Sequence, residues 1–143
     1  MKLLNDLLEE IYTLLDQIYG ITLNQATILL QPKNSNEESN EAIDLLNEMV
    51  EYKEELIINV TKKEQQFEEA YNPYRGKITA EQEVEEIKIL VNKIMNKKQE
   101  IVEKEKSNVL IMQNLGKKQN QVTHISPTPD KVVNAYKRTA KDA

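Results

Sequence analysis

Apolar residues recur along most of this chain at alternating steps of three and four, the spacing that places side chains on one face of an α-helix. Proline and glycine interrupt the pattern near Pro32, again at Pro73 and Gly76, and a last time from Gly116 onward. Both residue types end helices, because proline lacks a backbone donor and glycine loses the most entropy on ordering. The pattern therefore predicts an all-α protein with three long helices, over residues 3–30, 35–71 and 79–116.

The first stretch has an apolar face wider than a two-helix seam. Two neighbouring rows form this face, and we expect the helix to touch two neighbours. Gly20 lies inside the stretch, where it weakens or kinks a helix at a cost of about 1 kcal/mol relative to alanine. The rows are Leu4, Leu8, Ile11, Leu15 and Ile18, and beside them Leu7, Leu14, Ile21 and Ile28.

The second and third stretches carry their own start and stop signals. Ser35 followed by Glu38, and Thr79 followed by Gln82, have the spacing of a capping box. The second helix is expected to end near Tyr71, and the third at Gly116. The main apolar seam of the second helix contains Ile43, Leu46, Val50, Ile57, Val60, Phe67 and Tyr71, with Ala42, Leu45, Met49 and Leu56 widening it.

The third helix has its own apolar seam, made of Val84, Ile87, Val91, Ile94, Ile101, Met112 and Leu115. Five polar residues interrupt the two seams: Lys53 and Glu64 in the second helix, and Lys98, Glu105 and Asn108 in the third. Polar residues at seam positions weaken packing, but they help to set the register between helices or leave a groove open.

Helix lengths and turns predict the topology. The second and third helices have about 36 residues each, or about 54 Å, and a short turn joins them. This favours an antiparallel up-down-up bundle of three long helices, with the first helix lying along the hairpin of the other two. We assign residues 1–116 to the bundle and residues 117–143 to a basic tail. The tail either forms a short C-terminal helix bearing Val132, Val133 and Tyr136 or stays flexible.

Charge and composition narrow the function classes. The net charge of −5 divides into +4 from Lys117 onward and −9 over residues 1–116, which disfavours nucleic acid as a partner. No apolar run approaches the roughly 20 residues of a membrane span, so we expect no membrane insertion. The chain has no Cys, and acidic residues follow its first turn instead of a signal segment, so we expect a cytoplasmic protein.

Catalytic chemistry is poorly represented. His124 is the single histidine and stands in a polar stretch, where a solvated loop residue is the simplest interpretation. There is no zinc-ligand set, no Gly-rich phosphate loop and no nucleophilic triad. We therefore expect a protein that is not an enzyme, with no catalytic residues, no cofactor and no metal.

The segment from Asn108 to Leu115 carries the strongest functional signal. Val109 to Met112 are four successive apolar residues that advance about 100° each, so they point nearly all round the helix. Two bundle neighbours cover only part of that circumference. Some of these side chains are therefore expected to meet a further surface, which is the tail, a second copy or a partner; burial against the first helix and the tail is the alternative without a ligand.

The last third of the chain resembles the small flagellar export chaperones of the FliT and FlgN type. The run from Ile94 to Asn108, leading into Val109–Met112, is similar to their long late helix, in which an acidic residue is followed by asparagine and then leucines. The ending Val132-Val133-Asn134-Ala135-Tyr136 resembles the short C-terminal segment of versions from Gram-positive bacteria.

This resemblance implies a cytoplasmic chaperone of flagellar type III export. Such a protein holds an unassembled filament-cap or hook-associated protein through an amphipathic C-terminal part of that client, and then engages the export machinery. The filament-cap and hook-junction types stay undecided. The resemblance points to these partner-binding residues: Ile101, Asn108, Val109, Leu110, Met112 and Leu115 on the late helix, with Val133 and Tyr136 in the tail. The main alternative is a structural module, a coiled-coil or helical-bundle protein that binds a second copy of itself as a homodimer or larger oligomer.

Overall fold

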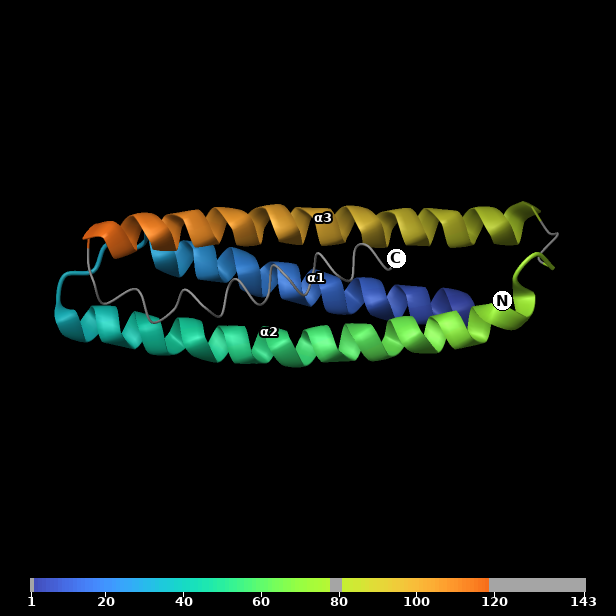
Figure 1. Ribbon diagram of the computed structural model, residues 1–143, viewed down its shortest axis with the longest axis horizontal. Coiled ribbons are helices and arrows are strands. Elements are labelled where there is room, and N and C mark those ends of the chain that lie inside the picture. Colours follow the sequence, from blue (N-terminus) through green and yellow to red (C-terminus); the bar gives the residue numbers. More distant parts are fainter. Residues whose placement is uncertain (1, 78–80, 119–143) are drawn as a thin grey trace.

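The computed structural model describes residues 2–77 and 81–118, and this part of the chain is helical with no strand. Three long helices extend side by side (Figure 1). The helices are α1 (Lys2–Leu30), α2 (Asn36–Tyr71) and α3 (Glu81–Lys118), with a short 3₁₀ helix, η1 (Asn72–Tyr74), after α2. The predicted all-α class with three packed helices is confirmed. The Thr79 capping position and the predicted tail helix lie outside the described residues.

Helix α1 packs against both α2 and α3, as its two apolar rows predict, whereas the backbones of α2 and α3 approach each other much less closely. Its first row is buried at Leu4, Leu8, Ile11, Leu15 and Ile18. In the second row, Leu7 is buried, whereas Leu14 and Ile21 are half-buried and pack at the edge of the same core. The remaining buried members of this core are Val50, Leu56 and Val60 of α2 and Ile94, Ile101 and Val102 of α3.

Polar contacts define which levels of the helices face each other. The Asn5 side-chain amide of α1 donates to the Glu86 carboxylate of α3 at 3.2 Å. Higher on α1, the Thr22 hydroxyl donates to the Glu105 carboxylate of α3 at 2.9 Å. Toward α2, Lys63 pairs with Glu10 at 3.0 Å. A second, smaller core cluster lies where the last turns of α1 meet the early part of α2 and the late part of α3. It consists of Leu29, Leu46 and Met112.

Ser35 caps the start of α2, as its sequence predicts. Its hydroxyl accepts a hydrogen bond from the Glu38 backbone N–H at 3.1 Å. The reciprocal bond is displaced by one residue: the Glu38 carboxylate accepts from the backbone N–H of Asn34 at 2.8 Å, rather than from that of Ser35. The cap thus ties the loop as well as the first turn, and it sets where α2 begins.

The proline and glycine positions expected to interrupt helices do so after α2, but not at Gly116 in α3 or at Gly20 in α1. Helix α2 ends at Tyr71, and Gly76 has a φ of 76°, a left-handed conformation that favours glycine. The predicted stop at Gly116 is wrong, because α3 continues through Gly116 to Lys118, the last residue that the structure describes. Helix α1 is also continuous through Gly20, where an added Cβ would meet nothing within 4 Å. A single glycine costs a helix about 1 kcal/mol, which packing along the rest of α1 outweighs.

Candidate functional site: the late part of α3

The residues expected to bind a partner divide into an inner and an outer group. Ile101 and Met112 are buried, at 0 % and 5 % exposed, and Asn108 is 2 % exposed. Val109 is half-buried, and Leu110 is 60 % exposed. The side chains of Leu115, Val133 and Tyr136 lie outside the described residues. Of the predicted set, Leu110 and Val109 are therefore the described side chains that reach the surface in this conformation.

The geometry of α3 explains this division. Met112 packs against Leu29 of α1 and Leu46 of α2, and Ile111 lies partly buried against the same cluster. Because successive helical residues turn by about 100°, Leu110 lies well away from Met112 and faces outward. Among the four successive apolar residues Val109–Met112, the surface left uncovered by the bundle therefore belongs to Leu110 and to the exposed parts of Val109 and Ile111.

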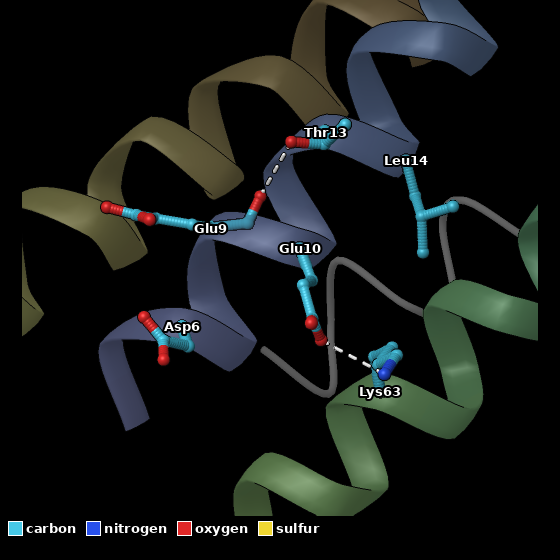
Figure 2. Close-up of a pocket in the computed structure, with 6 residues that line it drawn as sticks. All are labelled: Asp6, Glu9, Glu10, Thr13, Leu14 and Lys63. Carbon is cyan, nitrogen blue, oxygen red and sulfur yellow. Dashed lines mark hydrogen bonds and ion pairs between the residues drawn. The ribbon is translucent and has the colours of Figure 1, made fainter. Parts of the chain in front are cut away.

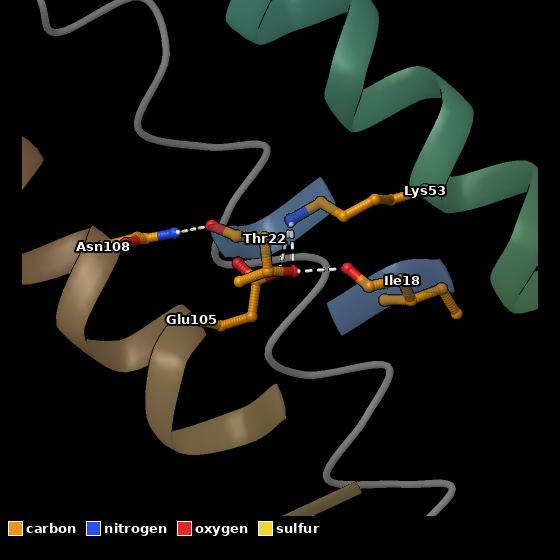
Figure 3. Close-up of polar contacts among 5 residues, drawn as sticks. All are labelled: Ile18, Thr22, Lys53, Glu105 and Asn108. Carbon is orange, nitrogen blue, oxygen red and sulfur yellow. Dashed lines mark hydrogen bonds and ion pairs between the residues drawn. The ribbon is translucent and has the colours of Figure 1, made fainter. Parts of the chain in front are cut away.

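A buried polar cluster that includes Glu105 and Asn108 of α3 joins all three helices (Figure 3). Lys53 of α2 forms an ion pair with Glu105 of α3, and both side chains are 1 % exposed. The Thr22 hydroxyl of α1 bonds Glu105 and also the carbonyl of Ile18, each at 2.9 Å. The Asn108 side-chain amide donates to the Thr22 carbonyl at 3.1 Å. The cluster ties α3 to both other helices at Glu105 and Asn108, shortly before the exposed Leu110 in the chain.

Burial dominates the electrostatics of this cluster. Removing the Lys53 ammonium from water disfavours its charged form, so burial lowers the pKa of Lys53, while the charge of Glu105 and its hydrogen bond oppose that shift. A buried ion pair gains little over an apolar pair of the same shape, but removing one partner leaves an uncompensated charge. The cluster is therefore suited to specifying how the helices align, and it includes no group arranged for nucleophilic attack.

Earlier on α3, Lys98 is a second buried lysine paired with a carboxylate of another helix. The Lys98 ammonium lies 2.9 Å from a Glu64 carboxylate oxygen of α2, with the Lys98 side chain 1 % exposed. Four of the five polar seam residues thus form two ion pairs between α2 and α3. In one pair the lysine is on α2 and the glutamate on α3, and in the other the positions are reversed. Their number and seam positions were readable from the sequence. Their pairing required the alignment of α2 with α3, which the sequence alone does not specify.

A shallow depression lined by residues of α1 and α2 has a volume of about 570 Å³ (Figure 2). Glu10 points toward Lys63 across it, whereas the Glu9 carboxylate points away. Thr13 donates its hydroxyl proton to the Glu9 carbonyl at 3.0 Å, so it is engaged in the helix itself. The remaining lining residues are Asp6 and Leu14. No base and nucleophile face each other here, and this hollow suggests no reaction.

The described residues include no group of three or more His, Asp or Glu side chains placed to hold a metal ion. Within the same ranges, no helix has both the length and the apolar content needed to cross a bilayer. Comparison with protein-family models, with curated proteins and with solved structures found no match to this chain.

Sequence reasoning missed one exposed apolar row, on α2. Leu45 was predicted to widen the buried seam, but it is 45 % exposed, and Tyr52, which belongs to neither predicted row of the second helix, is 52 % exposed. The seam is narrower than predicted because the backbone of α2 approaches that of α1 closely and that of α3 much less closely. The signal that could have revealed this row is its direct adjacency to a stripe of carboxylates.

Proposed function

We propose that this protein is a cytoplasmic export chaperone that holds the amphipathic C-terminal segment of a flagellar filament-cap or hook-associated protein before secretion. The observation that carries the proposal is the exposure of Leu110 on the late part of α3, beside half-buried Val109 and Ile111. A helix-in-groove partner needs an apolar strip that the bundle's own packing leaves uncovered. The resemblance of the Ile94–Met112 region to the late helix of these chaperones supplies the client class.

In this proposal the predicted contact residues act at two depths. Leu110 and Val109 meet the client first. Ile101, Asn108 and Met112 hold the strip in place from within, and they touch the client only if α3 shifts relative to α1. Leu115, Val133 and Tyr136 extend the surface along the end of α3 and the tail. The antiparallel up-down-up order belongs to the same proposal, and the opposite sense of numbering in the Lys53–Glu105 and Glu64–Lys98 pairs supports it.

Co-expression with C-terminal fragments of filament-cap and hook-junction proteins, followed by co-purification, tests the function. We expect one fragment to be retained by the wild-type chain and lost with Leu110→Lys. Ile89→Lys is the matched control, because Ile89 is also on α3 and is 52 % exposed. Circular dichroism establishes that each variant is folded. Failure of the folded wild type to retain either fragment would overturn the proposal, as would equal loss with the two variants.

A homo-oligomeric helical module is the second candidate, because exposed Leu110 can equally pack against a second copy. Light scattering separates the two functions. A stable oligomer that Leu110→Lys dissociates, with no retained client fragment, favours the module. A monomer that retains a fragment favours the chaperone.

A further inference from the structure

Helix α2 carries an incompletely covered apolar row along one edge. Leu45, Met49, Tyr52 and Leu56 follow one another at steps of four, three and four, so they share one helix face. Leu56 is buried and Met49 is half-buried, whereas Leu45 and Tyr52 are 45 % and 52 % exposed. Two turns of α2 therefore present apolar surface that the other two helices do not cover.

A stripe of carboxylates runs beside this row. Its members recur at steps of four and three over five turns, and every one of them is exposed. None takes part in an ion pair within the described residues. The single cation between residues 36 and 60 is Lys53, which is buried against Glu105. The stripe consists of Glu37, Glu41, Asp44, Glu48, Glu51 and Glu55.

We propose that this edge of α2 is the docking surface for a basic amphipathic helix of another protein. Apolar side chains of that helix would cover Leu45, Met49 and Tyr52, in the position that a fourth helix occupies in a four-helix bundle. Lysines and arginines on its flank would lie over the carboxylate stripe. The charge of the stripe selects the partner and speeds its approach, while the apolar row supplies the contact area.

The same charge argues against the other occupants. In an antiparallel two-fold contact between two copies, the stripe of one copy would lie beside that of the other, and like charges so placed are repelled. Anionic lipid and nucleic acid are repelled for the same reason. The surface is also separate from Leu110 on α3, so it does not depend on the proposed chaperone function.

Fluorescence anisotropy with a labelled synthetic peptide tests the proposal. The probe is a helix of about 18 residues made of leucine at helical spacing and lysine elsewhere, and the control peptide replaces each lysine by glutamate. We expect the full chain to bind the lysine peptide at about 150 mM salt, more weakly as salt rises, and not to bind the glutamate peptide. Lack of binding to the lysine peptide would overturn the proposal.

Two sets of variants locate the binding. The triple variant Asp44→Asn/Glu48→Gln/Glu51→Gln and the double variant Leu45→Ala/Tyr52→Ala should each weaken binding about tenfold or more. The control triple variant Glu68→Gln/Glu81→Gln/Glu85→Gln makes the same change in net charge at exposed sites elsewhere. It should weaken binding less than about twofold. Equal weakening by the two triple variants would show attraction to net charge only and would overturn the proposal.

The chain's own basic residues provide the remaining comparison. In the full chain, Lys131→Gln/Lys137→Gln/Arg138→Gln should leave peptide affinity unchanged. If this triple variant binds the peptide about tenfold more tightly, the chain's own tail competes for the surface. The proposal of a helix from another protein would then be wrong. Leu110→Lys should also leave peptide binding unchanged, so that failure of this proposal and failure of the chaperone function are distinguishable.

Discussion

Lys53 and Glu105 form an ion pair in the centre of the bundle although 52 residues separate them in the chain. The pair joins α2 to α3 where the backbones of these helices stand apart, and the Thr22 hydroxyl of α1 completes it. The cluster therefore specifies one alignment of three helices that apolar packing alone would set less strictly.

Breaking this pair on one side should be costly, and replacing both partners should not. Glu105→Leu leaves the Lys53 ammonium buried without its carboxylate, and we expect a loss of about 3–5 kcal/mol in the free energy of unfolding. Lys53→Met/Glu105→Leu should recover most of that loss. Urea denaturation of the wild type, both single variants and the double variant measures the coupling. A double variant as unstable as the single ones would contradict this account.

An exposed pair provides the control for that cycle. Lys63 and Glu10 are 35 % and 53 % exposed, so water already solvates both charges. Lys63→Met should change the free energy of unfolding by less than about 1 kcal/mol.

The stability of the wild type should depend on pH through Lys53. Burial lowers the pKa of Lys53 below its ordinary value of 10.5, so the folded chain releases this proton at a lower pH than the unfolded chain. Between the two pKa values the unfolded state binds more protons, and stability therefore rises with pH. We therefore compare the wild type with Lys53→Met/Glu105→Leu, which lacks this titrating group. As pH rises through this window toward 10.5, the free energy of unfolding of the wild type should increase relative to that of the double variant, by at most about 1.4 kcal/mol per pH unit. Urea denaturation at several pH values checks this, and a constant difference would refute it.

Gly20→Ala should stabilise the protein by about 1 kcal/mol. Gly20 lies within α1, and the added Cβ would meet no atom within 4 Å, so the gain in helix propensity is opposed by no clash. Gly76→Ala is the contrasting variant, because the φ of 76° there strains any side chain, and it should destabilise. Thermal unfolding of both variants should show shifts of opposite sign.

Ser35→Ala should cost about 1 kcal/mol through loss of the cap on α2. Ser35→Asp should retain stability, because its carboxylate can accept the same Glu38 N–H and suits the positive end of the helix dipole. Chemical denaturation of the two variants measures the difference. If both variants lose stability equally, the hydroxyl contact is not what stabilises this helix end.

Met112 and Leu110 should differ sharply in their contribution to stability. Met112→Ala removes a side chain packed between Leu29 and Leu46, with an expected loss of about 2–5 kcal/mol. Leu110→Ala removes a mainly exposed side chain and should stay within about 0.5 kcal/mol of the wild type. Denaturant midpoints provide the comparison. A large loss at Leu110 would mean that intramolecular contacts cover it in solution.

Much of the candidate site could be foreseen in kind but not in detail. The four apolar residues from Val109 to Met112 indicate that not all of them can be buried, but the rotation of α3 about its own axis decides which one is exposed. Leu110 faces outward because Met112 packs into the cluster with Leu29 and Leu46. The client itself stays a prediction that rests on the resemblance.

The sequence by itself determined the helical class, the Ser35 cap, the end of α2 at Tyr71 and the wide face of α1, because these features depend on neighbours within a few turns of the same helix. Only the tertiary structure decided that Lys53 meets Glu105, that Lys98 meets Glu64 and that Leu45 remains exposed. Those outcomes depend on how closely separate helices approach and at what level they align, and helical periodicity is the same for every such alignment.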